Sequence, residues 1–229
     1  MKLPRPVAAV VFDMDGLLFD TEKLYGQAIL TAADELGVEM TTEVFLRFIG
    51  TPWAHNRRQM LEAYGEAYPA EELRVAWMRH FKLLVAGNLD LKPGVAALLD
   101  LLDELGLPRA IATSSGHSTV DHHLAAHGLA GRFHHVVAAG DYANSKPAPD
   151  PFLKAAEHLG MDPRHCLALE DSLNGVRSAS AAGMMTVMVP DLIQPPGEIR
   201  ALCAAVAKSL LDVPALIMSS RHASAAASS

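Results

Sequence analysis

Two patterns of apolar residues divide the chain. Residues 7–12 form a short, unbroken apolar run, which predicts a strand covered on both faces. From Thr21 to about Gly87, apolar residues recur three and four positions apart, which predicts amphipathic helices. After Pro93, short apolar runs alternate with helical segments. That alternation is typical of a parallel sheet with helices packed against it.

The helical stretch predicts a domain inserted directly after the first strand. Four helices are expected to begin near Thr21, Thr42, Pro52 and Pro69, because Thr often caps a helix and Pro is tolerated in its first turn. The return to the sheet, residues 86–94, contains Gly, Asn and Pro, and we expect it to act as a hinge.

The remaining elements alternate along the chain. Strands are predicted at residues 109–113, 133–139, 166–169 and 186–189, with an edge strand at 208–211. Helices are predicted at 95–105, 118–127, 150–159, 172–182 and 194–205. The fold class is therefore α/β: a doubly wound parallel sheet, a Rossmann-like core, with an inserted α-helical cap domain. We assign residues 1–20 and 88–218 to the core, 21–87 to the cap, and the Ala- and Ser-rich residues 219–229 to a flexible tail.

Composition and charge narrow the classes of function. The chain has 229 residues and a formal net charge of −7, so no basic surface for a nucleic-acid polymer is expected. The amino-terminal apolar run meets two acidic residues at once, which predicts neither a signal peptide nor a membrane span. Two cysteines make no disulfide framework. We expect a cytoplasmic protein without membrane partners, as a monomer or a homodimer.

The first candidate site residues follow the first predicted strand. Asp13 and Asp15 are expected to point to the same side, because side chains alternate along a strand. Two carboxylates this close repel one another unless a cation lies between them or one is protonated. They suit either a Mg²⁺ ion, which prefers oxygen ligands, or a carboxylate that attacks phosphorus. Gly16 allows a sharp turn next to them. Taken alone, a strand that ends in a polar turn explains this motif equally well.

Three further motifs follow later in the chain, at or near the ends of predicted strands. The hydroxyls of Thr113 and Ser114 precede a helix and suit an anion, although an ordinary helix cap gives the same pattern. Lys146 lies in the stretch SKPAPDPF, in which prolines fix the backbone around its ammonium group. Glu170 and Asp171 follow another apolar strand and precede a helix, where acids also complement the helix dipole.

In this order, the motifs DMDG, TSSG, SKPAPDPF and LEDSLNG resemble the haloacid dehalogenase-like hydrolase superfamily. The helical block after the first motif looks like its subfamily with a small helical cap, and the resemblance spans roughly residues 7–190. It implies that Asp13 is the nucleophile that accepts the phosphoryl group. It also implies that Asp15 protonates the leaving oxygen and later activates the hydrolytic water, and that the phosphoryl oxygens are bound by Thr113, Ser114 and Lys146.

The resemblance further implies a Mg²⁺ cofactor. Its ligands would be Asp171, Asp13 and the backbone carbonyl of Asp15, with Glu170 as an additional or alternative ligand. Asn174 is expected to support this loop. The acid at position 15 also separates the chain from the dehalogenase-like members, which lack it.

We therefore predict a Mg²⁺-dependent phosphatase that hydrolyses a small phosphate monoester, such as a sugar phosphate or a similar metabolite, through an aspartyl-phosphate intermediate. The alternative is a β-phosphoglucomutase-like phosphotransferase. Mutase-like members have an Arg where Trp53 stands here, although Arg57 and Arg58 lie one turn further and can substitute for it. Tyr25 also stands where the family often has His. A phospho-receiver regulatory protein is a third hypothesis, against which the inserted helices and Asp15 both argue.

Overall fold

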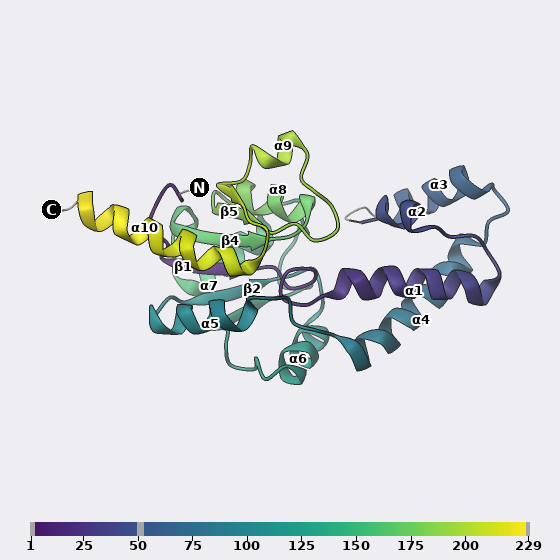
Figure 1. The fold of residues 1–229 in the computed structure, drawn as a ribbon, viewed down its shortest axis with the longest axis horizontal. Helices are drawn as coiled ribbons and strands as arrows, with labels where there is room; N and C mark the ends of the chain where they lie inside the picture. The colour runs from purple at the N-terminus through teal and green to yellow at the C-terminus, as the bar shows by residue number, and fades with distance from the viewer. Residues whose placement is uncertain (1–2, 50–52, 228–229) are drawn as a thin grey trace. The chain divides into compact units, whose positions relative to one another are not determined.

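A computed structural model describes residues 3–49 and 53–227 of the protein (Figure 1). The chain forms two compact units, one of Met1–Leu18 with Leu91–Ser229 and the other of Phe19–Asp90. We call the first the sheet unit and the second the helical unit. Residues 50–52, where one cap helix is predicted to end and the next to begin, lie outside the described residues.

The described part of the sheet unit contains one sheet of six parallel strands, in the order β3-β2-β1-β4-β5-β6. These strands are β1 (Ala9–Phe12), β2 (Arg109–Ala112), β3 (His135–Val137), β4 (Cys166–Glu170), β5 (Met185–Met188) and β6 (Ala205–Val206). The register aligns Phe12 with Ile111 of β2 and with Leu169 of β4. The carboxyl ends of three strands therefore lie together, and the predicted doubly wound sheet is confirmed.

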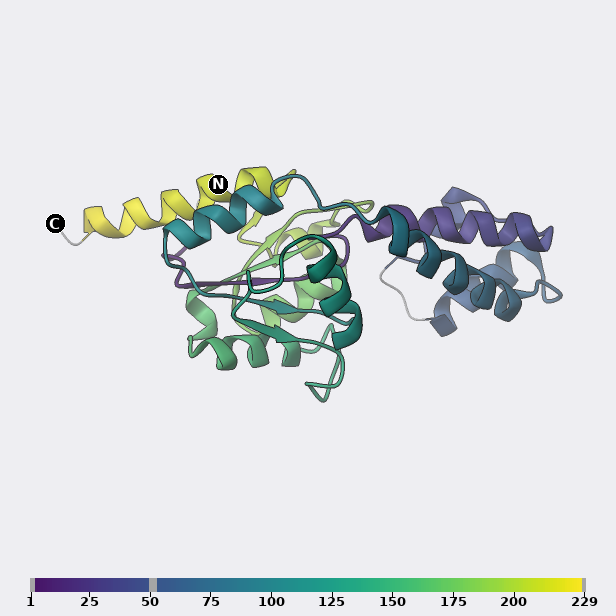
Figure 2. The same cartoon turned by 90° about the horizontal axis from the view of Figure 1, so that it is seen from below.

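Helices cover both faces of this sheet. In Figure 2, α5 (Val95–Glu104) and α10 (Val213–Ala227) lie on one face, whereas α7 (Asp150–Leu159) and α8 (Leu173–Ala181) lie on the other. The unit also contains α6 (His117–Ala126) and the short α9 (Gly197–Arg200). No helix among the described residues combines the length with the apolar character that a membrane crossing requires.

Small apolar side chains let α7 and α8 pack closely on the sheet. Phe152 and Ala155 of α7 and Ala179 of α8 share one buried cluster with Val11 of β1 and Ala168 of β4. Alternation along β1 turns the neighbouring Val10 and Phe12 toward the opposite face. Both of those side chains are also fully buried, as expected of a central parallel strand.

The structure corrects the sequence prediction near the end of the sheet. The helix predicted at 194–205 is reduced to α9, because Pro195 and Pro196 cannot donate backbone hydrogen bonds within a helix. The chain then joins the sheet edge as β6, which pairs with β5. The edge strand predicted at 208–211 is therefore wrong, and a 3-10 helix occupies Leu210–Asp212.

Helix α10 includes most of the residues expected to form a flexible tail. It runs from Val213 to Ala227 and buries Val213, Ile217 and Ser220. The Ser220 hydroxyl donates a hydrogen bond to the carbonyl of Ile217 at 2.7 Å. Alanine has the highest helix propensity, so an Ala-rich segment with one apolar face is compatible with a helix as well as with a tail.

The helical unit contains α1 (Thr21–Leu36), α2 (Thr42–Leu46), α3 (Trp53–Tyr64) and α4 (Ala70–Asn88). Thr41 caps α2 in place of the predicted Thr42: its hydroxyl accepts the hydrogen bond from the Val44 N–H, and the helix begins at Thr42. Helices α1 and α4 pack against each other along the unit.

Trp77 of α4 lies at the centre of the apolar core of the helical unit. It is 2% exposed, and its indole N–H donates to the carbonyl of Tyr25 at 2.9 Å. The ring of Tyr25 lies 4.3 Å from the ring of Trp77, and Phe45 and Phe48 approach from other sides. Tyr25, which stands where the family often has His, thus belongs to this core, and burial raises its pKa to about 12.

The chain crosses between the two units twice, once on leaving the sheet unit and once on returning to it. The two crossing segments are joined by one backbone hydrogen bond in each unit. In the sheet unit, the Lys92 N–H donates to the carbonyl of Leu18 at 2.9 Å. In the helical unit, the Asp20 N–H donates to the carbonyl of Asp90 at 2.9 Å. The insertion therefore leaves and rejoins the chain through neighbouring backbone segments.

We expect Trp77→Ala to lower the free energy of unfolding by about 3–5 kcal/mol, because it removes a buried ring and leaves a cavity. Urea unfolding followed by circular dichroism measures this change. Val75→Ala on the same helix is the control: Val75 is 72% exposed, and its truncation is expected to change stability by less than about 0.5 kcal/mol. Equal effects of the two substitutions would contradict the assignment of Trp77 to the core.

Candidate active site

The candidate site lies where β1, β2 and β4 end. Asp13 directly follows β1, and its N–H donates to the carbonyl of Leu169 in β4 at 3.0 Å. Glu170 is the last residue of β4, and Thr113 is the first residue after β2. Carboxyl ends of parallel strands form the usual site edge of an open α/β sheet. The sequence-predicted motifs therefore meet at one edge.

Lys146 is buried between two of the predicted carboxylates. Its ammonium group donates a hydrogen bond to Asp13 Oδ1 and another to Glu170 Oε1, the latter at 2.6 Å. The side chains of Lys146, Asp13 and Glu170 are 8%, 9% and 0% exposed. Charged groups removed from water in this way require close partners, and each of these has one.

The loop before α7 holds Lys146 in place. The Asn144 N–H and side-chain amide both donate to Asp150 Oδ1, which closes the loop around the lysine. The Lys146 ammonium also lies 5.0 Å from the centre of the Phe152 ring, a cation–π distance. The prolines of this loop restrict the backbone further. The loop thus presents the ammonium group with little freedom to move away.

Glu170 is fixed by the amino terminus of α8. Its Oε2 accepts hydrogen bonds from the N–H groups of Asp171 and Ser172 and from the Ser172 hydroxyl, each at 3.0 Å. Ser172 caps α8 by accepting from the Gly175 N–H. A Cβ on Gly175 would lie 1.8 Å from Glu170 Cδ, so glycine is required for this close approach.

Asp15 is held by a serine of the TSSG motif that was not among the predicted site residues. The Ser115 hydroxyl donates to Asp15 Oδ2 at 2.7 Å, and the Ser115 N–H donates to Thr113 Oγ1 at 3.0 Å. Thr113 is 1% exposed, whereas Ser114 is exposed. Ser114 and Ser115 lie in a bend beyond the end of β2, so strand alternation does not decide which of the two hydroxyls contacts Asp15.

Asn174, predicted to support the metal loop, lies in the first turn of α8. Its Oδ1 accepts a hydrogen bond from Arg177 at 3.3 Å. Arg177 in turn pairs with Glu198 at 2.9 Å. Gly175, next along the chain, has the more direct contact with Glu170, and its role could not be read from the motif letters alone.

The surroundings shift the proton affinities of both charged partners. Burial raises the pKa of Asp13 to about 8; Lys146 opposes this shift, and the charges of Glu170 and Asp15 add to it. Burial alone disfavours the ammonium form of Lys146, but Asp13 and Glu170 outweigh it and hold the pKa of Lys146 above its ordinary value. The site therefore contains excess negative charge in a poorly hydrated volume.

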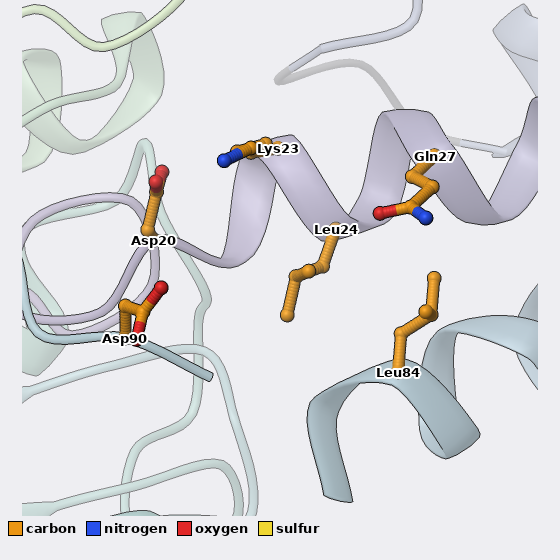
Figure 3. A pocket seen from close by; sticks show the side chains of 6 residues that line it. All are labelled: Asp20, Lys23, Leu24, Gln27, Leu84 and Asp90. Carbon is orange, nitrogen blue, oxygen red and sulfur yellow. The ribbon is translucent and has the colours of Figure 1, made fainter. Parts of the chain in front are cut away.

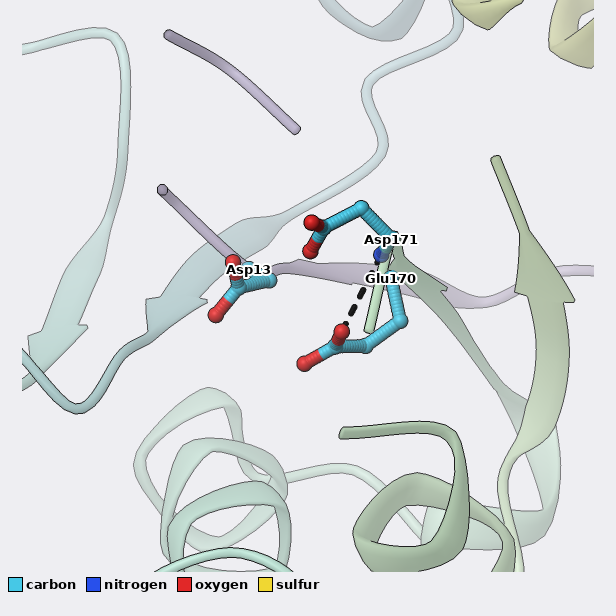
Figure 4. Close-up of side chains that lie close together, drawn as sticks. All are labelled: Asp13, Glu170 and Asp171. Atoms are coloured by element: carbon cyan, nitrogen blue, oxygen red, sulfur yellow. Dashed lines mark hydrogen bonds between the residues drawn. The ribbon is translucent and has the colours of Figure 1, made fainter. Parts of the chain in front are cut away.

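The carboxylates fit a hard divalent cation. Asp13, Glu170 and Asp171 each place an oxygen within 4.8 Å of the others, and all three are buried (Figure 4). An all-oxygen donor set suits ions such as Mg²⁺. Three carboxylates against the single charge of Lys146 leave an imbalance that a dication would remove. Both oxygens of Glu170 already accept hydrogen bonds, whereas the Asp171 carboxylate extends toward Asp13.

The helical unit has a pocket of its own, with a volume of about 300 Å³ (Figure 3). Its polar lining comes from Asp20, Lys23, Gln27 and Asp90, and Leu24 and Leu84 form its apolar side. This lining offers hydrogen-bond donors and acceptors without an excess of positive charge.

Known proteins are similar to this chain in sequence. A family model described as haloacid dehalogenase-like hydrolase matches residues 10–189, which include all four motifs. A "Probable pseudouridine-5'-phosphatase" of Drosophila melanogaster is 39% identical over 196 residues, covering 83% of this chain and 84% of that protein. Hexitol phosphatase B of Escherichia coli (strain K12) is 32% identical over 204 residues, covering 83% of this chain and 86% of that protein.

Solved structures agree with the sequence comparisons. The crystal structure of a "putative beta-phosphoglucomutase" from Thermotoga maritima matches with a TM-score of 0.77 and 26% identity, over 93% of this chain and 99% of that one. The family model extends over most of the chain, from within β1 to the residue after β5. The chain therefore belongs to the haloacid dehalogenase-like hydrolase family.

Proposed function

We propose that the protein is a Mg²⁺-dependent phosphatase that hydrolyses a small phosphate monoester through an aspartyl-phosphate intermediate. The observation that carries the proposal is the buried Lys146 ammonium between Asp13 and Glu170, with Asp171 beside them. This arrangement concentrates charges of both signs at one strand edge, as phosphoryl transfer requires. Relatives named hexitol phosphatase and pseudouridine-5'-phosphatase support a sugar phosphate or similar metabolite as the substrate.

Asp13 acts as the nucleophile. Lys146 holds Oδ1, which orients the carboxylate so that Oδ2 attacks phosphorus in line with the leaving oxygen. The same ammonium group lies close enough to balance negative charge on the transferred phosphoryl group. Thr113 Oγ1 accepts from the Ser115 N–H and retains its own proton to donate to a phosphoryl oxygen. Ser114, which is exposed, contributes a second hydroxyl.

Asp15 acts as general acid and then as general base. The Ser115 hydroxyl fixes its carboxylate by a 2.7 Å hydrogen bond, so that its other oxygen faces the leaving group. Asp15 first gives a proton to the departing alcohol oxygen. It then takes a proton from the water that hydrolyses the aspartyl-phosphate, which restores Asp13.

Asp13, Asp171 and the backbone carbonyl of Asp15 would hold the Mg²⁺ ion, with Glu170 as an additional or alternative ligand. When bound, the ion supplies Lewis-acid charge neutralisation at the phosphate. The hydrogen bonds of Glu170 to Lys146 and to the start of α8 support a structural role for Glu170 more than direct ligation. Asn174 supports the same loop from the first turn of α8.

A mutase reaction is the alternative, supported by the likeness to a "putative beta-phosphoglucomutase". Such a reaction needs a cation for a second phosphate. Arg57 lies 3.5 Å from Glu71, and Arg58 lies 3.7 Å from Glu62, so both arginines face acids of the helical unit. Exposed ion pairs of this kind are weak, so the acids hold the two arginines only loosely. The pairing therefore favours hydrolysis over the mutase reaction only modestly.

A cytoplasmic location is part of the proposal. Cys166 is buried, Cys203 is partly buried, and both are free thiols. Free thiols are the usual state of cysteine in a reducing compartment.

We expect phosphate release from sugar and polyol phosphates to require Mg²⁺ and to disappear in Asp13→Asn, which lacks the nucleophilic carboxylate. Asp15→Asn should reduce turnover by about 10²- to 10⁴-fold, the usual contribution of general acid–base catalysis. A malachite-green assay on a panel of phosphate esters measures both effects. Interconversion of hexose 1- and 6-phosphates without phosphate release would instead establish the mutase.

We expect stabilisation by Mg²⁺ to increase with pH. Burial raises the pKa of Asp13 from its ordinary value of 3.8 to about 8 in the folded protein without metal, so between these pH values the folded state keeps a proton that the unfolded state has lost. The free energy of unfolding of the metal-free protein therefore falls as pH rises from about 4 to 8. A bound cation displaces that proton. The exchange becomes more favourable as pH rises, because fewer protons in solution compete with the cation for Asp13.

Thermal melts with and without Mg²⁺ at pH 6 and pH 8 measure this dependence. The Mg²⁺-induced rise in Tm should be larger at pH 8 than at pH 6, and the difference should vanish in Asp13→Asn. Equal rises at the two pH values in the unmodified protein would show that Asp13 does not exchange a proton for the ion.

We expect Gly175→Ala to displace Glu170, because the new Cβ would overlap its carboxyl carbon. Overpacking of this kind costs about 1–3 kcal/mol of stability, and the lost contact between Glu170 and Lys146 should lower kcat as well. Gly197→Ala is the matched control, since its Cβ meets nothing within 4 Å. Unchanged kcat and Tm in Gly175→Ala would mean that Glu170 can move without consequence.

A further inference from the structure

An ion pair outside the four motifs links the candidate site to the end of β5. Lys92 Nζ lies 2.6 Å from Asp191 Oδ1, and the side chains are 19% and 13% exposed. Asp191 Oδ2 is buried and has no hydrogen-bond partner among the described residues. Removing Lys92 would therefore leave a largely buried carboxylate without its cation, which is unfavourable.

On one side, this pair continues into the turn that carries Asp15. The Lys92 N–H donates to the carbonyl of Leu18, and the Leu18 N–H donates to the carbonyl of Met14, each at 2.9 Å. Asp15 lies inside the turn that these hydrogen bonds close. Leu18 is fully buried, so the turn cannot shift without moving core side chains.

On the other side, the pair continues into the carboxylate cluster. Asp191 lies two residues beyond Val189, whose N–H donates to the carbonyl of Glu170 at 2.7 Å. Glu170 in turn contacts Lys146, which contacts Asp13. The contacts therefore form a closed ring that begins and ends at the segment from Asp13 to Leu18, and the Lys92–Asp191 pair is its outer link.

The turn is not fully packed on the side of the ion pair. Lys92 and Asp191 line a pocket of about 240 Å³ together with Gly16 and Leu17. A turn that borders a pocket has fewer van der Waals contacts to hold it in place. The position of the turn therefore depends more on its hydrogen bonds and on the ion pair.

We propose that Lys92 and Asp191 are positioning residues, which hold the Asp15 turn in the geometry required for proton transfer to the leaving oxygen. This inference rests on the proposed phosphatase function and assigns no contact with the substrate to either residue. Proton transfer is sensitive to small displacements of the acid, whereas Lys146 is held in place by the separate loop before α7.

The test compares leaving groups. A p-nitrophenolate departs without protonation, whereas the alcohol of sorbitol 6-phosphate needs the acid. In the Mg²⁺-loaded protein, Lys92→Met should lower kcat/KM for sorbitol 6-phosphate about 10- to 100-fold and change kcat/KM for p-nitrophenyl phosphate less than about twofold. Asp191→Asn should act in the same direction, and Lys92→Arg should restore most of the activity by keeping the charge.

Lys154→Met is the control, because it removes an exposed ion pair with Glu157 of the same unit without touching the ring. Equal losses on both substrates, or no loss on either, would overturn the positioning role. Absence of phosphate release by the unmodified protein would instead refute the proposed function, and the two failures are therefore distinguishable.

Hydrogen exchange provides a readout that does not depend on activity. Lys92→Met should speed exchange of the Leu18 amide, whose hydrogen bond closes the Asp15 turn, and Lys154→Met should not. Unchanged exchange at Leu18 in a folded Lys92→Met protein would overturn the inference. If Lys92→Met does not fold, the same comparison is made with Asp191→Asn, which keeps the shape of the side chain.

Discussion

A lysine ammonium buried between two carboxylates is the interaction on which the candidate site depends. Taking Lys146 out of water is unfavourable, and its contacts with Asp13 and Glu170 offset that penalty. The requirement constrains three parts of the chain at once: β1 must end at one carboxylate, β4 at the other, and the proline-containing loop must bring the lysine between them. Parallel register meets this requirement, because it pairs Phe12 with Leu169, and the two carboxylate residues are the next along each strand.

The same forces that build the fold also prepare the chemistry. Helix α8 needs acceptors for its first N–H groups, and Glu170 and Ser172 supply them. That need fixes the Glu170 carboxylate, which in turn fixes Lys146. Gly175 makes the close approach sterically allowed. An ordinary helix terminus thus becomes part of an electrostatic site, and structural and chemical roles cannot be separated at this position.

The sequence predicted the sheet and the strand-end residues because both depend on short, local patterns. Asp13 and Glu170 come at the ends of apolar runs, and parallel strands bring such ends together, whereas Lys146 was marked by the prolines of its loop. Contacts that depend on the direction of a side chain were harder to predict from the sequence. Ser115, and not the exposed Ser114, donates a hydrogen bond to Asp15. The last strand was also misplaced, since the two-residue β6 is defined by pairing with β5 and has little pattern of its own. The steric need for Gly175 appears only when Glu170 is folded against it.

The paired backbone segments at the base of the insertion have a consequence for how such proteins diversify. Leu18 is hydrogen-bonded to Lys92, and Asp20 to Asp90, so the inserted helices replace what would otherwise be a tight connection between neighbouring backbone positions. Exchange of the insert by recombination would leave the ends of that connection where they are, and the strand register would not need to change. The catalytic framework can therefore be inherited unaltered while selection acts on the inserted helices, which makes the insertion point a natural boundary for evolutionary modules and for engineered chimaeras.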